Sequence, residues 1–258
     1  MALPSALDPD FLASLRGRQL LVGLDFDGTL APIAPRPELA AMPSATRQVL
    51  ERLRGLHRIA VISGRGLNDV RAHVNVEGLV YGGCHGMQIE GPELSFAHDE
   101  ATVHLPVLRA AKEELCAELG DVKGILIEDK GLAVAVHRRN VAVGDHGRIE
   151  SAVDRALRSG LRRKRGKMID EVVPDVAWDK GRALLWLREA LGSELPALYL
   201  GDDVTDEDAF RVLKGEDVGV LVSERPRETA AARGLVDSEA VRTFLEALAA
   251  PGTRQSAR

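Results

Sequence analysis

A short apolar run near the N-terminus limits the fold of this chain more than any other feature. Residues 20–26 read Leu-Leu-Val-Gly-Leu-Asp-Phe, and the loop signal Asp27-Gly28 follows directly. Polar residues do not alternate with apolar ones before Asp25, which is the pattern of a strand buried on both faces. Helices cover both faces of the parallel sheets that contain such strands. We therefore expect an α/β fold.

Further apolar strands alternate with helices in both outer parts of the chain. The predicted strands span residues 58–63, 79–82, 197–200 and 218–222, and the predicted helices span 44–53, 179–191 and 238–249. Ser44 and Ser238 begin two of these helices, where a hydroxyl can act as an N-cap by accepting a backbone hydrogen bond. This alternation predicts a Rossmann-like, doubly wound parallel sheet.

The middle of the chain follows a different order. Helices are predicted at residues 107–119 and 145–158, and strands at 124–128, 132–137 and 168–173. The segment Asp129-Lys-Gly131 between two of these strands suits a β-hairpin turn. Strand–strand–helix–strand is an α+β pattern. We therefore expect residues 101–174 to form an inserted α+β domain, and residues 1–100 and 175–258 to form the α/β core.

Composition argues against several classes of protein. The 258 residues carry a net charge of −5, which gives no electrostatic reason to expect a nucleic-acid partner. We expect the basic run 162–165 to be a solvated loop. Cys84 and Cys116 make no disulfide framework, and no leader peptide or membrane-length apolar stretch is recognisable. We expect a cytoplasmic protein with reduced cysteines, a small-molecule substrate and no membrane partner; a monomer is compatible with these features.

Four polar motifs stand where predicted strands end or a predicted helix begins. They are Asp25-Phe-Asp-Gly-Thr-Leu30, Ser63-Gly-Arg65, Lys180-Gly181 and Gly201-Asp-Asp-Val-Thr-Asp-Glu-Asp208. The carboxyl ends of parallel strands meet at one edge of an open sheet, and ligands bind there. The carboxylates, the Ser63 hydroxyl and the Lys180 amine are therefore expected to lie close together.

This set of groups suits the hydrolysis of a phosphate ester. Asp25 is the expected nucleophile, since a carboxylate can attack phosphorus and form an aspartyl-phosphate. Asp27 lies two residues further on and is expected to protonate the leaving oxygen and then activate water. Ser63 and Lys180 are expected to hold the phosphate oxygens.

Mg²⁺ is the expected cofactor, because it prefers oxygen ligands and offsets the repulsion between carboxylates and phosphate. Asp25 and Asp202 are the expected ligands, with a further ligand from either Asp203 or Asp206. The acidic run 205–208 also fits a helix start, since acidic side chains are favoured at helix N-termini.

The four motifs, taken together and in this order, resemble those of the haloacid dehalogenase superfamily of phosphatases. The resemblance implies that Asp25 is the nucleophile and Asp27 the general acid and base. It implies that Ser63 and Lys180 bind phosphate. It also implies that Asp202 is a magnesium ligand and that the backbone carbonyl of Asp27 is another.

Longer runs are similar to those of the trehalose-6-phosphate phosphatase family. These runs are Tyr81-Gly-Gly-Cys-His-Gly86, Ile127-Glu-Asp-Lys-Gly131, His137-Arg-Arg139, Gly166-Lys-Met168, Glu171-Val-Val-Pro174, Trp178-Asp-Lys-Gly-Arg-Ala183 and Leu200-Gly-Asp-Asp-Val-Thr-Asp-Glu-Asp-Ala-Phe210. The family implies hydrolysis of trehalose 6-phosphate to trehalose and phosphate, with an inserted cap domain that binds the distal glucose. Glu128, Lys130 and Glu171 fall on the matching cap positions.

Simpler roles compete for several of these residues. Ser63 could cap the following helix, Arg65 could pair with a core acid, and His85 could be a packing residue instead of facing the sugar. Glu128 and Lys130 could form a solvated pair beside the hairpin turn. The expected substrate-binding residues are Ser63, Gly64, Arg65, His85, Glu128, Lys130, Glu171 and Lys180.

Two other functions compete with this one. One is a related phosphatase for another sugar phosphate, such as sucrose 6-phosphate or a glycosyl-phosphoglycerate; the runs at residues 128–130 and 166–168 argue against it. The other is a non-catalytic sugar-phosphate sensor. A sensor of that kind is expected to have lost Asp25 or Asp27, and both are present.

Overall fold

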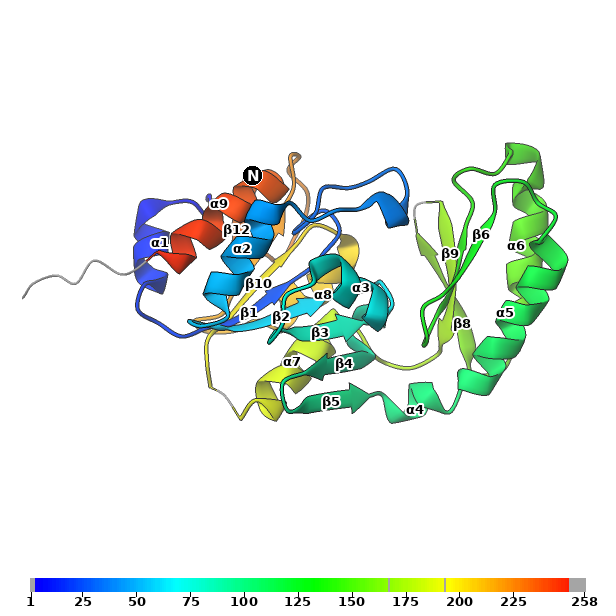
Figure 1. Cartoon of the computed structure of the whole chain (residues 1–258), viewed down its shortest axis with the longest axis horizontal. Helices are drawn as coiled ribbons and strands as arrows, with labels where there is room; N and C mark the ends of the chain where they lie inside the picture. Colours follow the sequence, from blue (N-terminus) through cyan, green and yellow to red (C-terminus); the bar gives the residue numbers. More distant parts are fainter. Residues whose placement is uncertain (1–2, 167, 193, 251–258) are drawn as a thin grey trace, which may run out of the picture.

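In the computed structural model, which describes residues 3–166, 168–192 and 194–250, the chain forms two β-sheets (Figure 1). The strands are β1 (Leu21–Leu24), β2 (Arg58–Ile62), β3 (Val80–Gly83), β4 (Gln88–Gly91), β5 (Leu94–Ala97), β6 (Leu126–Asp129), β7 (Val134–His137), β8 (Leu161–Gly166), β9 (Ile169–Pro174), β10 (Ala197–Gly201), β11 (Val218–Val222) and β12 (Arg233–Leu235). The large sheet has eight strands in the order β12-β11-β10-β1-β2-β3-β4-β5. The small sheet has four, in the order β6-β7-β9-β8.

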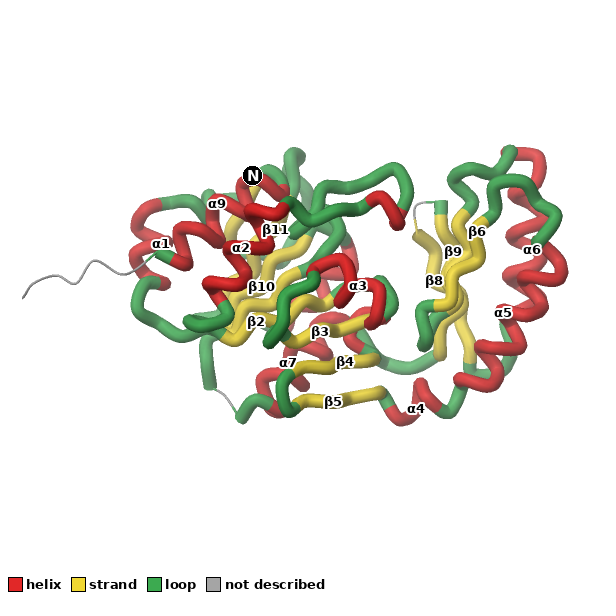
Figure 2. The backbone as a smooth tube through the Cα atoms, in the orientation of Figure 1, coloured by secondary structure: helices red, strands yellow, loops and turns green. Residues whose placement is uncertain are grey.

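Helices lie against both sheets, as Figure 2 shows in red. The α-helices are α1 (Pro9–Leu15), α2 (Ser44–Leu53), α3 (Leu67–Val74), α4 (Asp99–Thr102), α5 (Leu105–Leu119), α6 (His146–Ala156), α7 (Lys180–Ala190), α8 (Glu207–Val212) and α9 (Ser238–Ala249). The 3₁₀ turns are η1 (Pro37–Leu39), η2 (Cys84–Gly86), η3 (Val143–Asp145) and η4 (Val204–Asp206). Within the described ranges, none of the helices has the length and apolar character needed to cross a membrane.

The large sheet is parallel through its centre. β1 pairs with β10 on one side and β2 on the other, so that Leu21 lies opposite both Ala197 and Arg58. β3, β11 and β12 continue the parallel order. The α/β prediction is therefore confirmed. The antiparallel hairpin β4–β5 at one edge was not predicted, because its short strands mix polar and apolar residues without a clear period.

The two faces of β1 belong to different apolar cores, which explains its continuous apolar run. Val22 and Leu24 are buried in a core that includes residues of α1, α2, α3 and α9. Leu21 is buried in a second core, which includes residues of α7 and α8. Helices thus cover both faces of the strand, as in a doubly wound fold.

The small sheet is antiparallel throughout and has helices on one face only. Leu115 of α5 and Val153 of α6 share an apolar core with Val136 and Val172 of the sheet. In Figure 1 these helices lie on the side away from the large sheet, so the other face of the small sheet is turned toward it. The elements of the small sheet fall inside residues 101–174. The domain boundaries themselves stay a prediction.

The prediction of a solvated loop over residues 162–165 was wrong, because this run lies within β8. β8 pairs with β9 along its whole length. Arg163 donates to Asp170 of β9 at 2.8 Å and to Asp154 of α6 at 2.9 Å. Partners on neighbouring elements therefore neutralise a charge that sequence alone would leave in solvent.

Two predicted N-caps are displaced by one residue, because Ser44 and Ser238 are the first helical residues. Asp237 is the N-cap of α9, and its carboxylate accepts a hydrogen bond from the amide of Ala240 at 2.8 Å. Pro43 occupies the N-cap position of α2, where no side chain caps the helix. A carboxylate caps as well as a hydroxyl, so residue type alone did not separate Asp237 from Ser238.

Gly83 offers a test of the packing between β3 and α3. A Cβ atom on Gly83 would lie 2.3 Å from the backbone nitrogen of Leu67 and 2.5 Å from its Cα, both fixed by the start of α3. Gly83→Ala should therefore lower the free energy of unfolding by about 1–3 kcal/mol. Urea denaturation measures this. Gly144→Ala, whose Cβ would meet nothing within 4 Å, is the matched control, and equal effects of the two changes would contradict the packing argument.

Candidate active site

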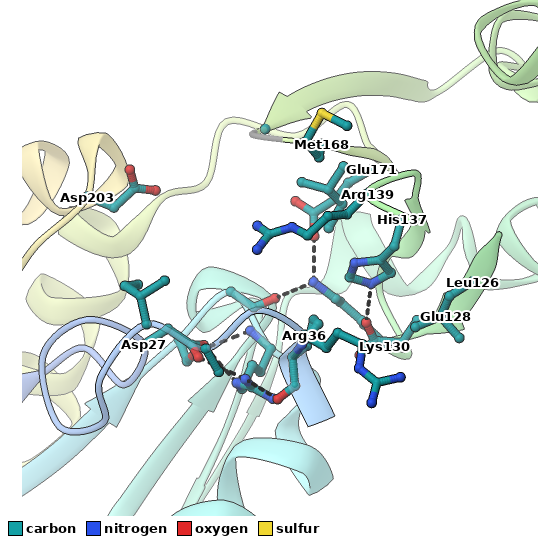
Figure 3. A pocket seen from close by; sticks show the side chains of 18 of the residues that line it. Asp27, Arg36, Leu126, Glu128, Lys130, His137, Arg139, Met168, Glu171 and Asp203 are labelled. Atoms are coloured by element: carbon teal, nitrogen blue, oxygen red, sulfur yellow. Dashed lines mark hydrogen bonds and ion pairs between the residues drawn. The ribbon is translucent and has the colours of Figure 1, made fainter. Parts of the chain in front are cut away.

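All four predicted motifs contribute to one cavity between the two sheets. Asp25 directly follows β1, Ser63 follows β2, Asp202 follows β10, and Lys180 begins α7. The cavity has a volume of about 890 Å³. Figure 3 shows Glu171 of β9 and Lys130 of the β6–β7 hairpin on one side of the cavity and Asp27, which follows β1, on the other. The fold therefore brings these groups together, as the sequence predicts.

The innermost part of the site is a buried ion cluster around Lys180. Its ammonium lies 2.8 Å from Asp25 Oδ1 and 2.7 Å from Asp206 Oδ1. Burial by itself disfavours the charged ammonium, but the negative charges of Asp206 and Asp25 outweigh burial and raise the pKa of Lys180. Lys180 is therefore a permanent cation fixed beside the predicted nucleophile, and its burial shows that it is not a solvated helix residue.

Crowding of carboxylates opposes the ionisation of Asp25 and Asp202. Burial raises the pKa of Asp25; Lys180 opposes this, and the charges of Asp206 and Asp202 raise it further. Burial, followed by the charge of Asp206, raises the pKa of Asp202 to about 7. One oxygen from each of the three aspartates lies within 4.8 Å of the others. Asp202 Oδ1 is also buried without a hydrogen-bond partner among the described residues.

Asp206 is part of this cluster, and further hydrogen bonds hold its carboxylate in place. Its Oδ1 also accepts from the Tyr199 hydroxyl at 2.8 Å, and its Oδ2 accepts from the Asp203 amide at 2.9 Å. The Asp203 carboxylate in turn caps η4, and it is not one of the three clustered carboxylates. Of the two further ligands considered from sequence, Asp206 lies in the cluster and Asp203 lines the cavity beside it. The metal role of Asp203 stays a prediction.

Arg65 holds the second predicted catalytic carboxylate, Asp27. Its Nε and Nη2 donate to the two Asp27 oxygens at 2.7 and 2.8 Å, and it also donates to Asp69 and to the Pro37 carbonyl. Burial disfavours the Arg65 charge, but hydrogen bonds to Asp27 and Asp69 outweigh burial and raise its pKa. The competing role for Arg65, pairing with a core acid, is therefore observed, and that acid is Asp27.

The loop after β2 lies at the centre of the cavity wall. The buried Ser63 accepts a hydrogen bond from the Arg65 amide at 3.2 Å. It does not cap α3, because Gly66 is the N-cap residue. A Cβ on Gly64 would lie 2.8 Å from the ring of His85, so this ring packs directly against the loop. Phosphate binding by Ser63 and Gly64 stays a prediction.

His85 joins the large sheet to the small one. Its backbone is left-handed, with φ 59°, and its Nε2 lies 2.6 Å from Nζ of Lys164 on β8. Burial, reinforced by the charge of Lys164, lowers the pKa of His85 well below its ordinary value. His85 is therefore neutral. Its Nε2 is assigned as the acceptor of a hydrogen bond from the Lys164 ammonium. Its predicted contact with substrate stays a prediction.

The three predicted sugar-binding residues lie together on the small-sheet wall of the cavity (Figure 3). Lys130 pairs with Glu171 at 2.7 Å and also donates to the Gly64 carbonyl at 3.2 Å. Glu128 lies 2.8 Å from Nε2 of His137. Lys130 is buried, so it is not half of a solvated pair. Its contact with Gly64 brings the hairpin onto the predicted phosphate loop.

Several cavity-lining residues were not singled out from the sequence. Arg36 stands in the proline-rich segment, and Arg139 donates to the Pro35 carbonyl at 2.8 Å. Lys164 lies in the basic run at residues 162–165, for which the sequence predicts a loop. The sequence offered one signal for two of these residues: His137 and Arg139 belong to the run His137-Arg-Arg139, which is similar to that of the trehalose-6-phosphate phosphatase family. The residues of this group are Arg36, His137, Arg139, Asn140, Lys164 and Arg165.

Comparisons with known proteins show what this chain is similar to. A family model described as trehalose-phosphatase matches residues 23–240. The trehalose-phosphate phosphatase of Mycobacterium tuberculosis (strain ATCC 25618 / H37Rv) is 39% identical over 257 residues, which cover 96% of this chain. The chain spans 66% of that relative's length.

Solved structures share the fold. A trehalose-6-phosphate phosphatase related protein superposes with a TM-score of 0.79 at 25% identity, covering 89% of this chain and 96% of the other. A haloacid dehalogenase-like hydrolase from Bacteroides thetaiotaomicron gives a TM-score of 0.63 at 17% identity, covering 89% and 99%. At that identity the likeness shows the fold alone. With the sequence match over most of its length and this haloacid dehalogenase-like fold, the chain belongs to the trehalose-phosphatase family.

Proposed function

We propose that the protein hydrolyses trehalose 6-phosphate to trehalose and inorganic phosphate. The observation that carries this proposal is that one cavity has a group suited to attack phosphate on one wall and polar groups suited to bind a sugar on the opposite wall. Asp25 and Lys180 form a buried reactive pair on one side, and Glu128 and Glu171 face them from the other. The family match supports the same substrate. We also place the protein in the cytoplasm, which fits its two free cysteines.

Asp25 is the proposed nucleophile, held in place by Lys180. Its carboxylate oxygen attacks phosphorus, the bond from phosphorus to the sugar oxygen breaks, and an aspartyl-phosphate forms. Asp27 gives a proton to the departing sugar oxygen and then takes one from the water that releases phosphate. Both Asp27 oxygens accept hydrogen bonds from Arg65. Each oxygen keeps a second lone pair that can carry the proton, so Arg65 fixes where the carboxyl group of Asp27 points without blocking its protonation.

The acidic cluster fits Mg²⁺. Asp202 Oδ1 is buried and has no partner among the described residues, and burial with neighbouring charges disfavours ionisation of both Asp25 and Asp202. A divalent cation relieves both problems, and oxygen donors are those that Mg²⁺ prefers. Asp25 and Asp202 would hold it, with the Asp27 carbonyl and Asp203 as the further proposed ligands. When bound, Mg²⁺ would offset the charge of the substrate phosphate.

Asp25→Asn tests the nucleophile. An amide does not attack phosphorus as a carboxylate does, so phosphate release from trehalose 6-phosphate should fall by at least about three orders of magnitude. A colorimetric phosphate assay measures this, with circular dichroism as the check that the variant is folded. Substantial turnover by a folded Asp25→Asn protein would contradict the mechanism.

A panel of substrates tests the sugar. Sucrose 6-phosphate and a glycosyl-phosphoglycerate are the competing substrates for a related phosphatase, and trehalose 6-phosphate should give the highest kcat/KM of the three. A protein that binds these sugar phosphates but hydrolyses none of them would instead be a sensor.

Metal binding should depend on pH in a defined direction. The pKa of Asp202 is about 7 in the folded protein, far above its ordinary value of 3.8. Its contribution to stability is therefore full below the ordinary pKa and is lost as the pH rises through about 7. Mg²⁺ removes this penalty, so it should raise Tm more at about pH 8 than at about pH 5.5. Differential scanning fluorimetry measures both shifts, and Asp202→Asn is the control in which the part of this pH dependence that comes from Asp202 should be lost.

Glu128 and Lys130 should respond differently to truncation. Glu128 contacts His137 on the small-sheet wall, so Glu128→Ala should lower kcat/KM for trehalose 6-phosphate about 10- to 1,000-fold and spare p-nitrophenyl phosphate. Lys130 also holds the Gly64 carbonyl, so Lys130→Ala should slow the hydrolysis of both substrates. Parallel steady-state assays decide this; equal losses on the two substrates for Glu128→Ala would show that Glu128 does not read the sugar.

A further inference from the structure

A second cavity, of about 430 Å³, adjoins the catalytic one. Its wall is built from β8, the segment after β9 and the start of α7. Four residues line both cavities, so their side chains form a wall common to the two spaces. These shared residues are His85, Lys164, Lys180 and Thr205.

Cations outnumber carboxylates among the side chains that line the second cavity, where the carboxylates are those of Asp179 and Asp208. Besides Lys164 and Lys180, it is lined by Arg162 and Arg182, each of which forms a long ion pair, Arg162 with Asp175 and Arg182 with Asp179. Arg162 lies 3.5 Å from Asp175, and Arg182 lies 3.9 Å from its partner carboxylate, with the two arginine side chains 43% and 58% exposed. Such loose surface pairs contribute little. Both guanidinium groups are therefore available to an oxyanion.

Two buried donors in the same wall lack an acceptor. An ammonium can only donate, so Nε2 of His85, 2.6 Å from Nζ of Lys164, is assigned as the acceptor, and the proton of the neutral ring is assigned to Nδ1. This Nδ1 is buried and has no partner in the described part of the chain, and the same is true of Nε1 of Trp178. Both residues line the second cavity. Unsatisfied buried donors are costly, and oxygen atoms of a bound anion would offset that cost.

We propose that the second cavity binds inorganic phosphate and is the route by which this product leaves the catalytic site. The inference rests on the proposed phosphatase function. Phosphate is produced at Asp25 and Lys180, the innermost part of the catalytic cavity, with the sugar between it and the small sheet. Lys180 and His85 line both spaces. Phosphate can therefore pass them toward Arg162 and Arg182 without crossing the sugar.

The time between cleavage and phosphate release tests this route. Arg162→Gln with Arg182→Gln removes two cations that touch neither the reacting atoms nor the sugar wall. Acid quench measures cleavage to inorganic phosphate, hydrolysis of the aspartyl-phosphate included, in the first turnover, and a fluorescent phosphate-binding protein measures free phosphate. Cleavage should keep its rate, and free phosphate should appear roughly three- to tenfold later. Release as fast as in the parent protein would overturn the proposal.

Arg148→Gln with Arg242→Gln is the matched control. It removes the same charge, one cation from α6 and one from α9, and neither residue lines the second cavity. Its release should match that of the parent. A delay equal to that of the cavity variant would mean that overall charge, and not the cavity, slows release, which also overturns the proposal. Running the assay with p-nitrophenyl phosphate keeps the test valid if trehalose 6-phosphate proves not to be the substrate.

Soaking crystals with tungstate locates the anion directly. Tungstate mimics phosphate and scatters anomalously, so two peaks are expected, one beside Lys180 in the catalytic cavity and one against Arg162 and Arg182. The Arg162→Gln, Arg182→Gln protein should keep the first peak and lose the second. An empty second cavity at a tungstate concentration that fills the catalytic one would contradict the assignment.

Discussion

The buried ammonium of Lys180 is the interaction on which the rest of the site depends. It lies between carboxylates from two strand ends, Asp25 after β1 and Asp206 after β10. Without it, three aspartates would share a space less than 5 Å wide with no counter-charge. Loss of one partner from a buried ion cluster costs several kcal/mol, because the remaining charges are left uncompensated. The start of α7 is therefore fixed electrostatically to the centre of the sheet.

A second set of contacts links catalysis to the small sheet, and it converges on the loop of residues 63–65. Arg65 holds Asp27, the Gly64 carbonyl accepts from Lys130, and the His85 ring covers Gly64 while contacting Lys164. One of these contacts, that of Lys130, comes from the part of the chain that holds the small sheet, and a second, that of His85, continues to Lys164 of β8. A shift of that unit relative to the core therefore changes the surroundings of the predicted phosphate loop directly.

Much of the fold and of the inner site was predictable from the sequence, because both follow from local patterns. A doubly buried strand such as β1 needs an unbroken apolar run, and the residues after parallel strands meet at one edge whatever their partners. Asp25, Ser63 and Asp202 were found in this way. The sequence allowed Arg65 to pair with a core acid but did not identify that acid as Asp27, because the pairing depends on how residues 38 positions apart are oriented, which spacing does not determine.

The basic run 162–165 shows most clearly why the remaining features escaped prediction. A run of four charged residues favours a solvated loop when its tertiary partners are unknown. In this fold the run has partners on both faces of strand β8. Arg163 is neutralised by Asp170 across the sheet, whereas Lys164 points the other way and reaches His85. Because successive side chains of a strand point to opposite faces, Arg163 and Lys164 have different roles. Arg163 pairs with Asp170 within the small sheet, and Lys164 lies in the wall shared by the two cavities. Neither role is visible until β8 is paired with β9.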